Sequence, residues 1–354
     1  MLPSSIELRD TITWIASRTS YPHSYKLAYD MRNLQNSVQA DFPRAQVLPT
    51  PSGLKFLLDG HELAGYHFGH GLPKPFIYPL KGHSGADLTR LGHPNPQSNH
   101  DHHRSIWFGH QFVRPIEMEK GQKPATAVEW NFWEEPKPIS DIKIRHSKVL
   151  ALEDGSEFAA AAVEANWWAG GRSLIKQTTV YAIAPMADGG HALDIQTELA
   201  CLDGRMIELG KTNFGLLGVR VAKSMSEQFG GGRLLNSEGR TGEPEIFAKP
   251  ARWVDYSGPT GPGRVEGICY MDHASNPRHP VSWHVRRDGW MEAAFTMADA
   301  WRIAADHPLT LRYRLLAHSG KSTLEILNQS WLEFNKTKPY QISQPKGQIP
   351  IVMR

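Results

Sequence analysis

The sequence predicts a mainly β fold built from antiparallel strands. Glycine (31), proline (25), tryptophan (11) and tyrosine (10) are spread along the chain, as is typical of strands joined by many turns. Residues 193–201 and 309–315 alternate apolar and polar side chains, a period that gives a strand one buried face and one polar face. The chain contains neither a GxGxxG nor a Walker motif, which argues against a doubly wound α/β fold.

The expected elements follow from turn signals and periodicity. Glycine-containing turns near 154–155, 170–171 and 188–190 separate three expected strands, at about 157–168, 173–184 and 192–202, that would form a meander. The segment 230–263 is rich in glycine and proline and is interpreted as an ordered loop. Ser322 and Glu325 fit a capping box, and the apolar residues that follow recur at helical spacing: Leu324, Leu327, Trp331 and Phe334.

We therefore expect three parts along the chain. Residues 1–45 would form a polar N-terminal extension, 46–320 the β domain that carries the site, and 321–354 a C-terminal helix and tail. The C-terminal helix is expected to lie on the sheet with its apolar face inward.

Composition limits the class of protein. The chain has 354 residues, 40% of them hydrophobic and 21% charged, with a formal charge of only +3, so neither a nucleic-acid nor a membrane partner is expected. The two cysteines, Cys201 and Cys269, are predicted to be buried thiols. No apolar run reaches the roughly 18 to 20 residues that span a bilayer, and the N-terminus lacks the usual signal-peptide pattern. A cytoplasmic location is the expectation, and exposed sheet edges make a homodimer reasonable.

The segment 99–110, NHDHHRSIWFGH, concentrates imidazole more than folding alone requires. On an extended backbone His100 and His102 point to one side and His103 to the other. Three interpretations stay open: a divalent metal site formed by His100 and His102 with His110 or a carboxylate, a metal-free cluster for proton transfer and sugar hydroxyl binding, or half-buried structural histidines. Arg104 would bind a carboxylate, either of a ligand or of the protein itself.

Three further segments mix polar and aromatic side chains. The run 253–258 contains Asp255, and the run 208–215 contains Lys211, which could stabilise an anion or lie in solvent. The run 271–286 is interpreted as a loop before a strand, although turn formation explains some of its polar residues equally well. Its candidate residues are Asp272, Asn276, His279, Trp283 and His284.

Tryptophans lie in or beside these segments, and indole rings stack on the apolar C–H faces of sugars while polar neighbours bind the hydroxyls. They are Trp107, Trp130, Trp133, Trp253, Trp283 and Trp290. The pattern favours a carbohydrate ligand, with core packing as the alternative for any single tryptophan.

Six runs, in this order over roughly residues 75–320, resemble the bacterial family labelled "methane oxygenase PmoA-like". They are HDHHRSIWFGH, GLLGVRVAKS, LLNSEGRTG, ARWVDYSG, MDHASNPRHPVSWHVRRDG and LTLRYRLLAHSG. The name describes a membrane-spanning oxygenase subunit, so no oxygenase function is inferred from it. The resemblance implies a fold similar to the galactose-mutarotase-like β-supersandwich group, which includes sugar epimerases and polysaccharide lyases. It supplies no established catalytic residues, and Ser105 stands where the family usually has glycine.

The sequence thus favours a carbohydrate-active enzyme that uses acid–base chemistry in epimerisation, elimination or hydrolysis. His103 or His284 would accept a proton, His102 or Asp272 would return one, and Arg104 and Lys211 would stabilise negative charge. The expected substrate-binding residues are Trp107, Asp255, Asn276, His279 and Trp283. The alternatives are a metal-dependent lyase or hydrolase acting on an oxidised sugar, with metal ligands from His100, His102 and His110, and a non-catalytic carbohydrate-binding protein.

Overall fold

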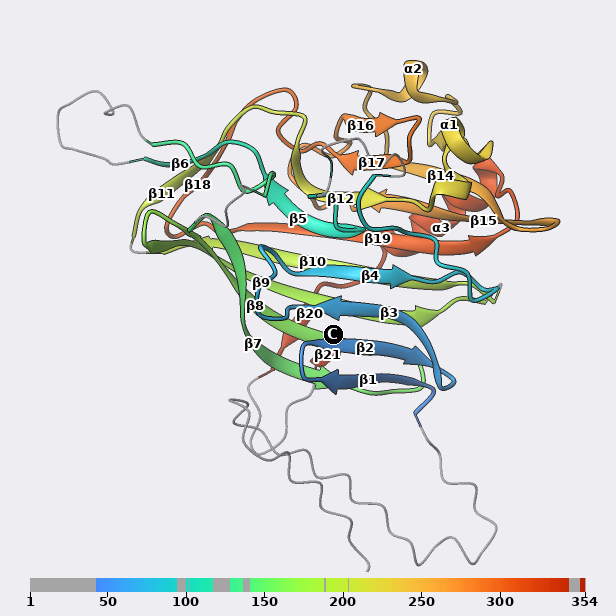
Figure 1. Cartoon of the computed structure of the whole chain (residues 1–354), viewed down its shortest axis with the longest axis horizontal. Coiled ribbons are helices and arrows are strands. Elements are labelled where there is room, and N and C mark those ends of the chain that lie inside the picture. Colours follow the sequence, from blue (N-terminus) through green and yellow to red (C-terminus); the bar gives the residue numbers. More distant parts are fainter. Residues whose placement is uncertain are drawn as a thin grey trace, which may run out of the picture. The chain divides into compact units, whose positions relative to one another are not determined.

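A computed structural model describes residues 43–93, 100, 102–116, 128–135, 141–187, 189–202, 204–343 and the backbone of 351–353. Residues 44–354 form one compact unit. Its strands build two eight-stranded antiparallel sheets, visible as two layers of arrows in Figure 1. The predicted mainly β, antiparallel sandwich with a C-terminal helix is therefore confirmed. None of the helices in this described part is both long and apolar enough to cross a bilayer.

The first sheet carries the candidate site at one end. In spatial order it consists of β1 (Ala45–Thr50), β2 (Gly53–Leu58), β3 (His61–His67), β4 (Phe76–Leu80), β5 (Ile106–His110), β12 (Gly215–Arg220), β17 (Trp290–Ala293) and β16 (Trp283–Arg286).

The second sheet is formed by longer strands. Its order is β13 (Arg233–Asn236), β14 (Trp253–Gly261), β15 (Arg264–Asp272), β19 (Leu309–Ser319), β10 (His191–Cys201), β9 (Arg172–Pro185), β8 (Ala159–Ala169) and β7 (Lys143–Glu153). The three strands predicted between 157 and 202 correspond to β8, β9 and β10, which are consecutive neighbours in this sheet.

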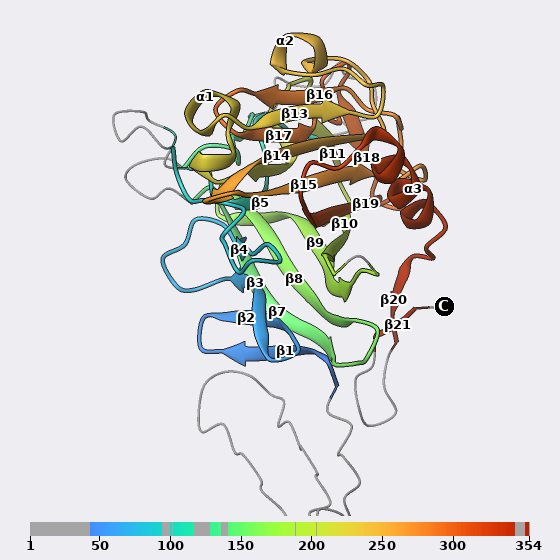
Figure 2. The same cartoon turned by 90° about the vertical axis from the view of Figure 1, so that its right-hand side faces the viewer.

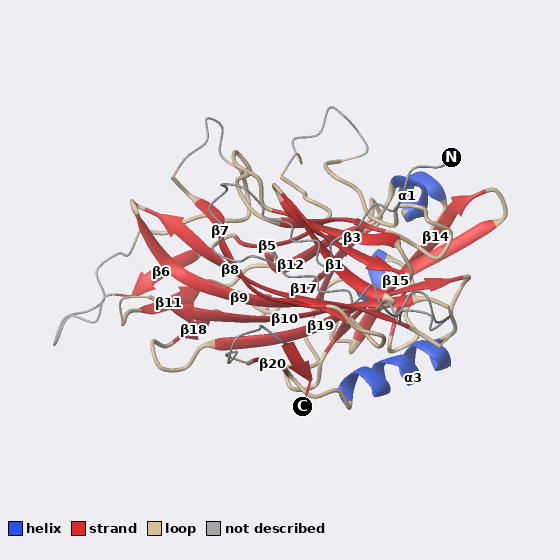
Figure 3. Cartoon of the chain, turned by 90° about the horizontal axis from the view of Figure 1, so that it is seen from below, coloured by secondary structure: helices blue, strands red, loops and turns tan. Residues whose placement is uncertain are grey.

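Smaller elements complete the unit. A three-stranded sheet contains β18 (Trp301–Ile303), β11 (Met206–Leu209) and β6 (Val113–Ile116), and β20 (Tyr340–Ile342) pairs with β21 (Ile351–Met353). The helices are α1 (Glu227–Gly230), α2 (Glu243–Ile246) and α3 (Leu324–Asn335), with a 3₁₀ turn at Lys223–Met225. In Figure 3, α1 and α3 lie on opposite sides of the strand layers.

The main hydrophobic core lies between the two sheets. In β10 the residues Leu193, Ile195 and Leu199 belong to this core, whereas Asp194 and Gln196 face the other way and bond Arg314 and Tyr340. This matches the predicted period of two, because side chains alternate along a strand. Cys201 and Cys269 are both buried free thiols, as expected.

The segment 230–263 is not a loop. It contains β13, α2 and all of β14, and Trp253 and Tyr256 are fully buried on opposite faces of β14. The glycines and prolines that suggested a loop lie partly in the connections between these elements and partly within them, as Pro244 does in α2 and Gly258, Pro259 and Gly261 do in β14. Residues 1–42 of the expected N-terminal extension lie outside the described residues.

The predicted C-terminal helix forms and packs on the outer face of the second sheet (Figure 2). Leu327, Trp331 and Phe334 are buried there, while Leu324 is 38% exposed. The N-cap is Thr323, not Ser322, because the Thr323 hydroxyl accepts the N–H of Ile326.

Candidate functional site

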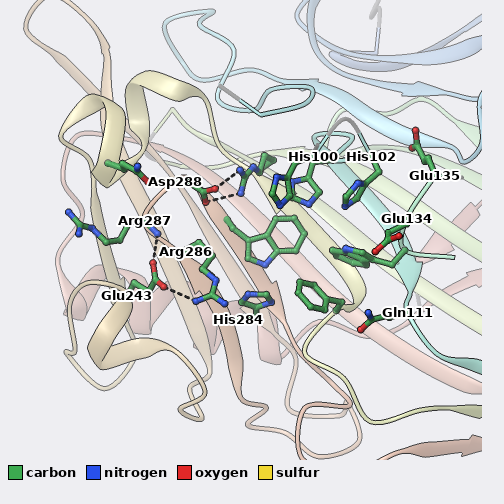
Figure 4. Close-up of a pocket in the computed structure, with 16 residues that line it drawn as sticks. His100, His102, Gln111, Glu134, Glu135, Glu243, His284, Arg286, Arg287 and Asp288 are labelled. Atoms are coloured by element: carbon green, nitrogen blue, oxygen red, sulfur yellow. Dashed lines mark hydrogen bonds and ion pairs between the residues drawn. The ribbon is translucent and has the colours of Figure 1, made fainter. Parts of the chain in front are cut away.

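A pocket of about 580 Å³ lies on the face of the first sheet that points away from the core. Strands β12, β17 and β16, helices α1 and α2 and the segments on either side of β5 contribute to it. Figure 4 shows His100 and His102 on one side, His284 below them, and charged residues at both ends. The lining residues are His100, His102, His103, Gln111, Trp133, Glu134, Glu135, Phe214, Arg220, Gln228, Glu243, His284, Arg286, Arg287, Asp288 and Trp290.

Strand register explains why these residues meet. Ile106, Val219, Met291 and Val285 point into the core, so the residues between them point to the pocket face. Directly paired residues on that face form a row across five strands: Phe76, Trp107, Gly218, Glu292 and His284. The next row contains Arg220, Trp290 and Arg286.

The floor of the pocket is aromatic. The indole centroids of Trp107 and Trp290 are 5.1 Å apart, and Trp133 lies 5.3 Å from Trp290. Gly218 makes this packing feasible, because a Cβ there would be 2.6 Å from the Trp290 ring and 3.2 Å from the Trp107 ring. The glycine thus leaves room for two indoles to close over β12.

His284 lines the pocket and carries an unprotonated ring nitrogen that is itself buried. Its Nδ1 lies 2.8 Å from the carbonyl oxygen of Asn213 and must donate, because a carbonyl only accepts. Its Nε2 therefore carries the lone pair, and it has no partner among the described residues. Burial lowers the pKa of His284 to about 4, so the ring is neutral at pH 7.

The three neighbouring histidines predicted from the sequence do converge. The ring centroid of His103 lies 4.9 Å from that of His100 and 4.5 Å from that of His102. His103 also stacks on Trp107 at 5.3 Å and contacts Trp290 at 4.9 Å. Burial, with the nearby positive charge of Arg220, lowers the pKa of His103 well below its usual range, so this ring is a neutral part of the floor.

Ser105 follows this cluster in a conformation that favours glycine. Its φ is 70° and its side chain is fully buried. Few non-glycine residues adopt this left-handed region, so the turn between His103 and β5 stores backbone strain.

The charged lining groups are held in pairs. Both terminal nitrogens of Arg220 donate to the Asp288 carboxylate, at 2.9 and 2.8 Å. Burial alone would raise the pKa of Asp288, but these hydrogen bonds and the charge of Arg220 lower it, so the carboxylate is ionised. Arg286 donates to Glu243 at 2.8 Å, and the dashed lines in Figure 4 mark this pair.

Arg104 forms an internal ion pair and does not line the pocket. Its Nε lies 2.9 Å from Glu135, which does line it. The second of the two interpretations offered for Arg104 therefore describes its position. Behind the pair, the buried ammonium of Lys74 donates to the carbonyls of Phe132 and Trp133, and burial lowers its pKa to about 8.

Buried polar atoms without a hydrogen-bond partner gather around the pocket. Within the described ranges they include His103 Nδ1, His284 Nε2, Trp107 Nε1, Trp290 Nε1, Arg220 Nε and Glu292 Oε2. Buried polar groups are usually satisfied, so a concentration of such atoms at one place needs an explanation. Glu292 is fully buried beside His284, and burial raises the pKa of its carboxyl, which favours the protonated form.

Asp272, Asn276 and His279 lie outside the pocket, beneath α3. Asp272 accepts from Asn276 at 2.7 Å and contacts His279 at 2.7 Å. The Trp331 indole donates to the Asp272 carbonyl at 2.9 Å and stacks on His279, so α3 covers the cluster. These three side chains, which the sequence suggested for the site, do not reach the pocket, because the helix packs over them.

The other predicted residues also lie elsewhere. Asp255 is buried and contacts His318 at 2.7 Å, and His318 contacts Ser322 near the start of α3. Trp283 is a core residue that donates to the Ala251 carbonyl. Lys211 is exposed and does not line the pocket, and Trp107 supports the floor from below without lining it.

His110 does not join His100 and His102. Its Nε2 lies 3.1 Å from the Gly210 carbonyl, and its ring is fully buried against Gly215, away from the pocket lining. Among the described residues, no group of three or more His, Cys, Asp or Glu side chains is arranged to hold a metal ion. The predicted three-histidine set is therefore not assembled.

Sequence reasoning missed the charged residues of the pocket, chiefly Arg220, Asp288, Glu243 and Glu135. A usable signal exists for Arg220, because it ends an otherwise apolar strand and alternates with core residues. Asp288 lies in the turn between β16 and β17, Glu243 begins α2 and Glu135 lies between β6 and β7, in segments of ordinary polar composition that carry no such signal.

Comparisons with known proteins show a family and distant structural likenesses. No curated protein sequence matches the chain significantly. The structure is similar to the GalM/aldose epimerase homologue from C. elegans, with 8% identity and a TM-score of 0.31, over 80% of this chain and 100% of that one. It is also similar to the 4-alpha-glucanotransferase from Thermococcus litoralis, with 9% identity and a TM-score of 0.26, over 78% of this chain and 39% of that one.

These two likenesses do not bear on function. Neither these structures nor the matching family model carries the methane oxygenase PmoA-like name. The family model matches residues 53–332, which is most of the chain and includes every residue that lines the pocket. The chain belongs to the family of unknown function DUF6807.

Proposed function

We propose that the protein is a carbohydrate-active enzyme whose reaction is proton transfer on a sugar bound in the His284 pocket. One observation supports this above the others: unpartnered polar atoms surround a pocket with an aromatic floor. A sugar offers complementary surfaces to both, since its C–H faces stack on aromatic rings and its hydroxyls donate and accept hydrogen bonds.

His284 is the proposed general base. Its Nδ1–H is fixed on the Asn213 carbonyl, so its Nε2 lone pair is oriented before the ligand arrives. His102 is the proposed partner that returns a proton, because it lines the same pocket. Asp272, which lies beneath α3, has no place in this scheme.

The reaction needs no co-reactant in its simplest form. His284 Nε2 takes the proton of a sugar hydroxyl, the electron pair of that O–H bond forms a carbonyl, and the ring C–O bond breaks. His102 gives its proton to the departing ring oxygen, and the reverse sequence closes the ring. Elimination uses the same two groups with a C–H proton, and hydrolysis adds water.

Arg220 is proposed to stabilise negative charge in place of Arg104 and Lys211. It lines the pocket, and its Nε–H has no partner in the described part of the chain. The bidentate pair with Asp288 holds the guanidinium in one position, which favours preorganised stabilisation.

The test is turnover of neutral mono- and disaccharides followed by proton NMR, which separates mutarotation, elimination and hydrolysis by their products. His284→Gln is expected to lower the observed rate by about 10²- to 10⁴-fold. His307→Gln, the same change at a histidine whose side chain is 81% exposed, is the matched control and is expected to leave the rate unchanged.

Three results would contradict the proposal. Equal turnover by the two variants would remove His284 from the chemistry. Binding without turnover in the wild type would make the protein a carbohydrate-binding protein. Absence of both binding and turnover would argue against a carbohydrate ligand.

A further inference from the structure

Most of the charged side chains that line the pocket already have opposite charges beside them. The lining contains three cations, Arg220, Arg286 and Arg287, and four carboxylates. Arg220 is bound to Asp288 through both terminal nitrogens, and Arg286 to Glu243 through one. A ligand carboxylate that approached either guanidinium would also approach the protein carboxylate that it holds.

The opposite end of the pocket is acidic at its surface. Glu135 is bound to Arg104, and Glu134 is exposed with no side-chain partner among the described residues. Here too the groups that a ligand meets first are carboxylates, since Arg104 does not line the pocket.

Two more cations lie behind the lining without reaching it. Lys74 donates to the carbonyls of Phe132 and Trp133. Arg90 donates to the carbonyls of Val221, Gly92 and Asp288. Most of their N–H groups donate to backbone carbonyls and neither side chain is among the lining residues, so neither offers its charge to a ligand in the pocket.

Arg287 is the exception among the lining cations of the described structure. Its side chain is exposed and has no partner there, but its backbone N–H donates to Glu243. Figure 4 shows Arg287 at the end of the pocket beyond Arg286, far from His284. An anion held at Arg287 would therefore lie at the mouth of the pocket.

From this arrangement we propose that the pocket selects an uncharged polyhydroxylated ligand and rejects the corresponding acidic sugar. This rests on the proposed carbohydrate function and names its substrate class. Each ion pair, Arg220 with Asp288 and Arg286 with Glu243, holds guanidinium donors beside carboxylate acceptors, an arrangement that suits neighbouring hydroxyls of a sugar. A uronate bound beside His284 would lose the water around its carboxylate, and neither Arg220 nor Arg286 would be free to compensate that charge.

The test is binding of matched sugars that differ only at C6, measured by saturation-transfer and titration NMR. The probes are methyl glucoside and methyl glucuronide, with the galacto and manno pairs. The wild type is expected to bind at least one neutral sugar at least about tenfold more tightly than its uronide. That factor corresponds to the lower end of the free energy of a hydrogen bond to a charged group.

A variant reduces the preference for the neutral sugar if the reasoning is right. Glu243→Gln leaves the charge of Arg286 uncompensated and is expected to improve uronide binding by about tenfold. Glu245→Gln, on the same helix but outside the pocket lining, is the control and is expected to change the affinity for neither the neutral sugar nor the uronide. The double variant Glu243→Gln with Arg286→Gln removes the free cation again, and should return to the wild-type preference.

The outcomes separate the two proposals. A uronide that binds the wild type as tightly as its neutral partner overturns the selection proposed here and leaves the carbohydrate function standing. Identical uronide binding by Glu243→Gln and Glu245→Gln would overturn it as well. Binding of none of the six probes would count against the carbohydrate site, and the selection would fall with it.

Discussion

Gly218→Ala tests whether the indole floor depends on the missing side chain at this position. The added Cβ would lie 2.6 Å from the Trp290 ring and 3.2 Å from the Trp107 ring. Carbon atoms in contact prefer about 3.5 to 4.0 Å, so the Trp290 indole must move by about 1 Å. Trp290 is 2% exposed and touches His103 and His284, so it has little space to move into.

Overpacking of this kind costs about 1 to 3 kcal/mol of the free energy of unfolding. Urea unfolding gives that free energy, and near-ultraviolet circular dichroism reports the coupled indoles directly. Gly69→Ala is the matched control, because Gly69 lies in a loop where the added Cβ would meet only Ser52, at 3.3 Å. If Gly218→Ala matches the control in both measurements, the indoles do not depend on this glycine and the reasoning is refuted.

Two further predictions concern buried groups that titrate abnormally. Burial lowers the pKa of His110 to about 4, so the unfolded chain binds a proton near pH 6.5 while the folded unit does not. The free energy of unfolding therefore falls as the pH is lowered from 6.5 to 4. In denaturant titrations, His110→Gln should lose up to about 3 kcal/mol less of that free energy than the wild type across this window. Burial lowers the pKa of Lys74 to about 8, so the unfolded chain holds more protons between pH 8 and 10.5 and stability rises with pH there. Lys74→Met should lack up to about 3 kcal/mol of that rise in the free energy of unfolding. If the wild type and Lys74→Met show the same pH dependence, the Lys74 ammonium is not buried.

The sequence carries the strand pattern well because alternation is a local property. Residues 193–201 and 309–315 show it, and their apolar members lie in the core of the second sheet. His102, His103 and His284 were also identified, since imidazole in such density is uncommon on structural grounds alone. These residues line one pocket because β5 and β16 belong to the same sheet, and no local sequence pattern predicts that arrangement.

The misplaced residues have a common cause in long-range packing. Asp272 and His279 form a polar cluster whose composition fits an active site, but Trp331 packs on it from 52 residues further along the chain than His279. Arg220 and Asp288 become partners because β12 and β17 are neighbours. Strand pairing and helix docking decide both cases, and a single sequence gives no register between distant strands.

The central claim is that His284 is neutral and directs its Nε2 lone pair into the pocket. Nitrogen-15 NMR of histidine-labelled protein reads the tautomer and charge of each imidazole. At pH 7 the resonances absent from His284→Gln are expected to show a neutral ring protonated at Nδ1, and the Nε2 resonance is expected to shift when methyl glucoside, methyl galactoside or methyl mannoside is added. A protonated ring, an Nε2–H tautomer, or sugar binding that leaves His284 unmoved would contradict the account.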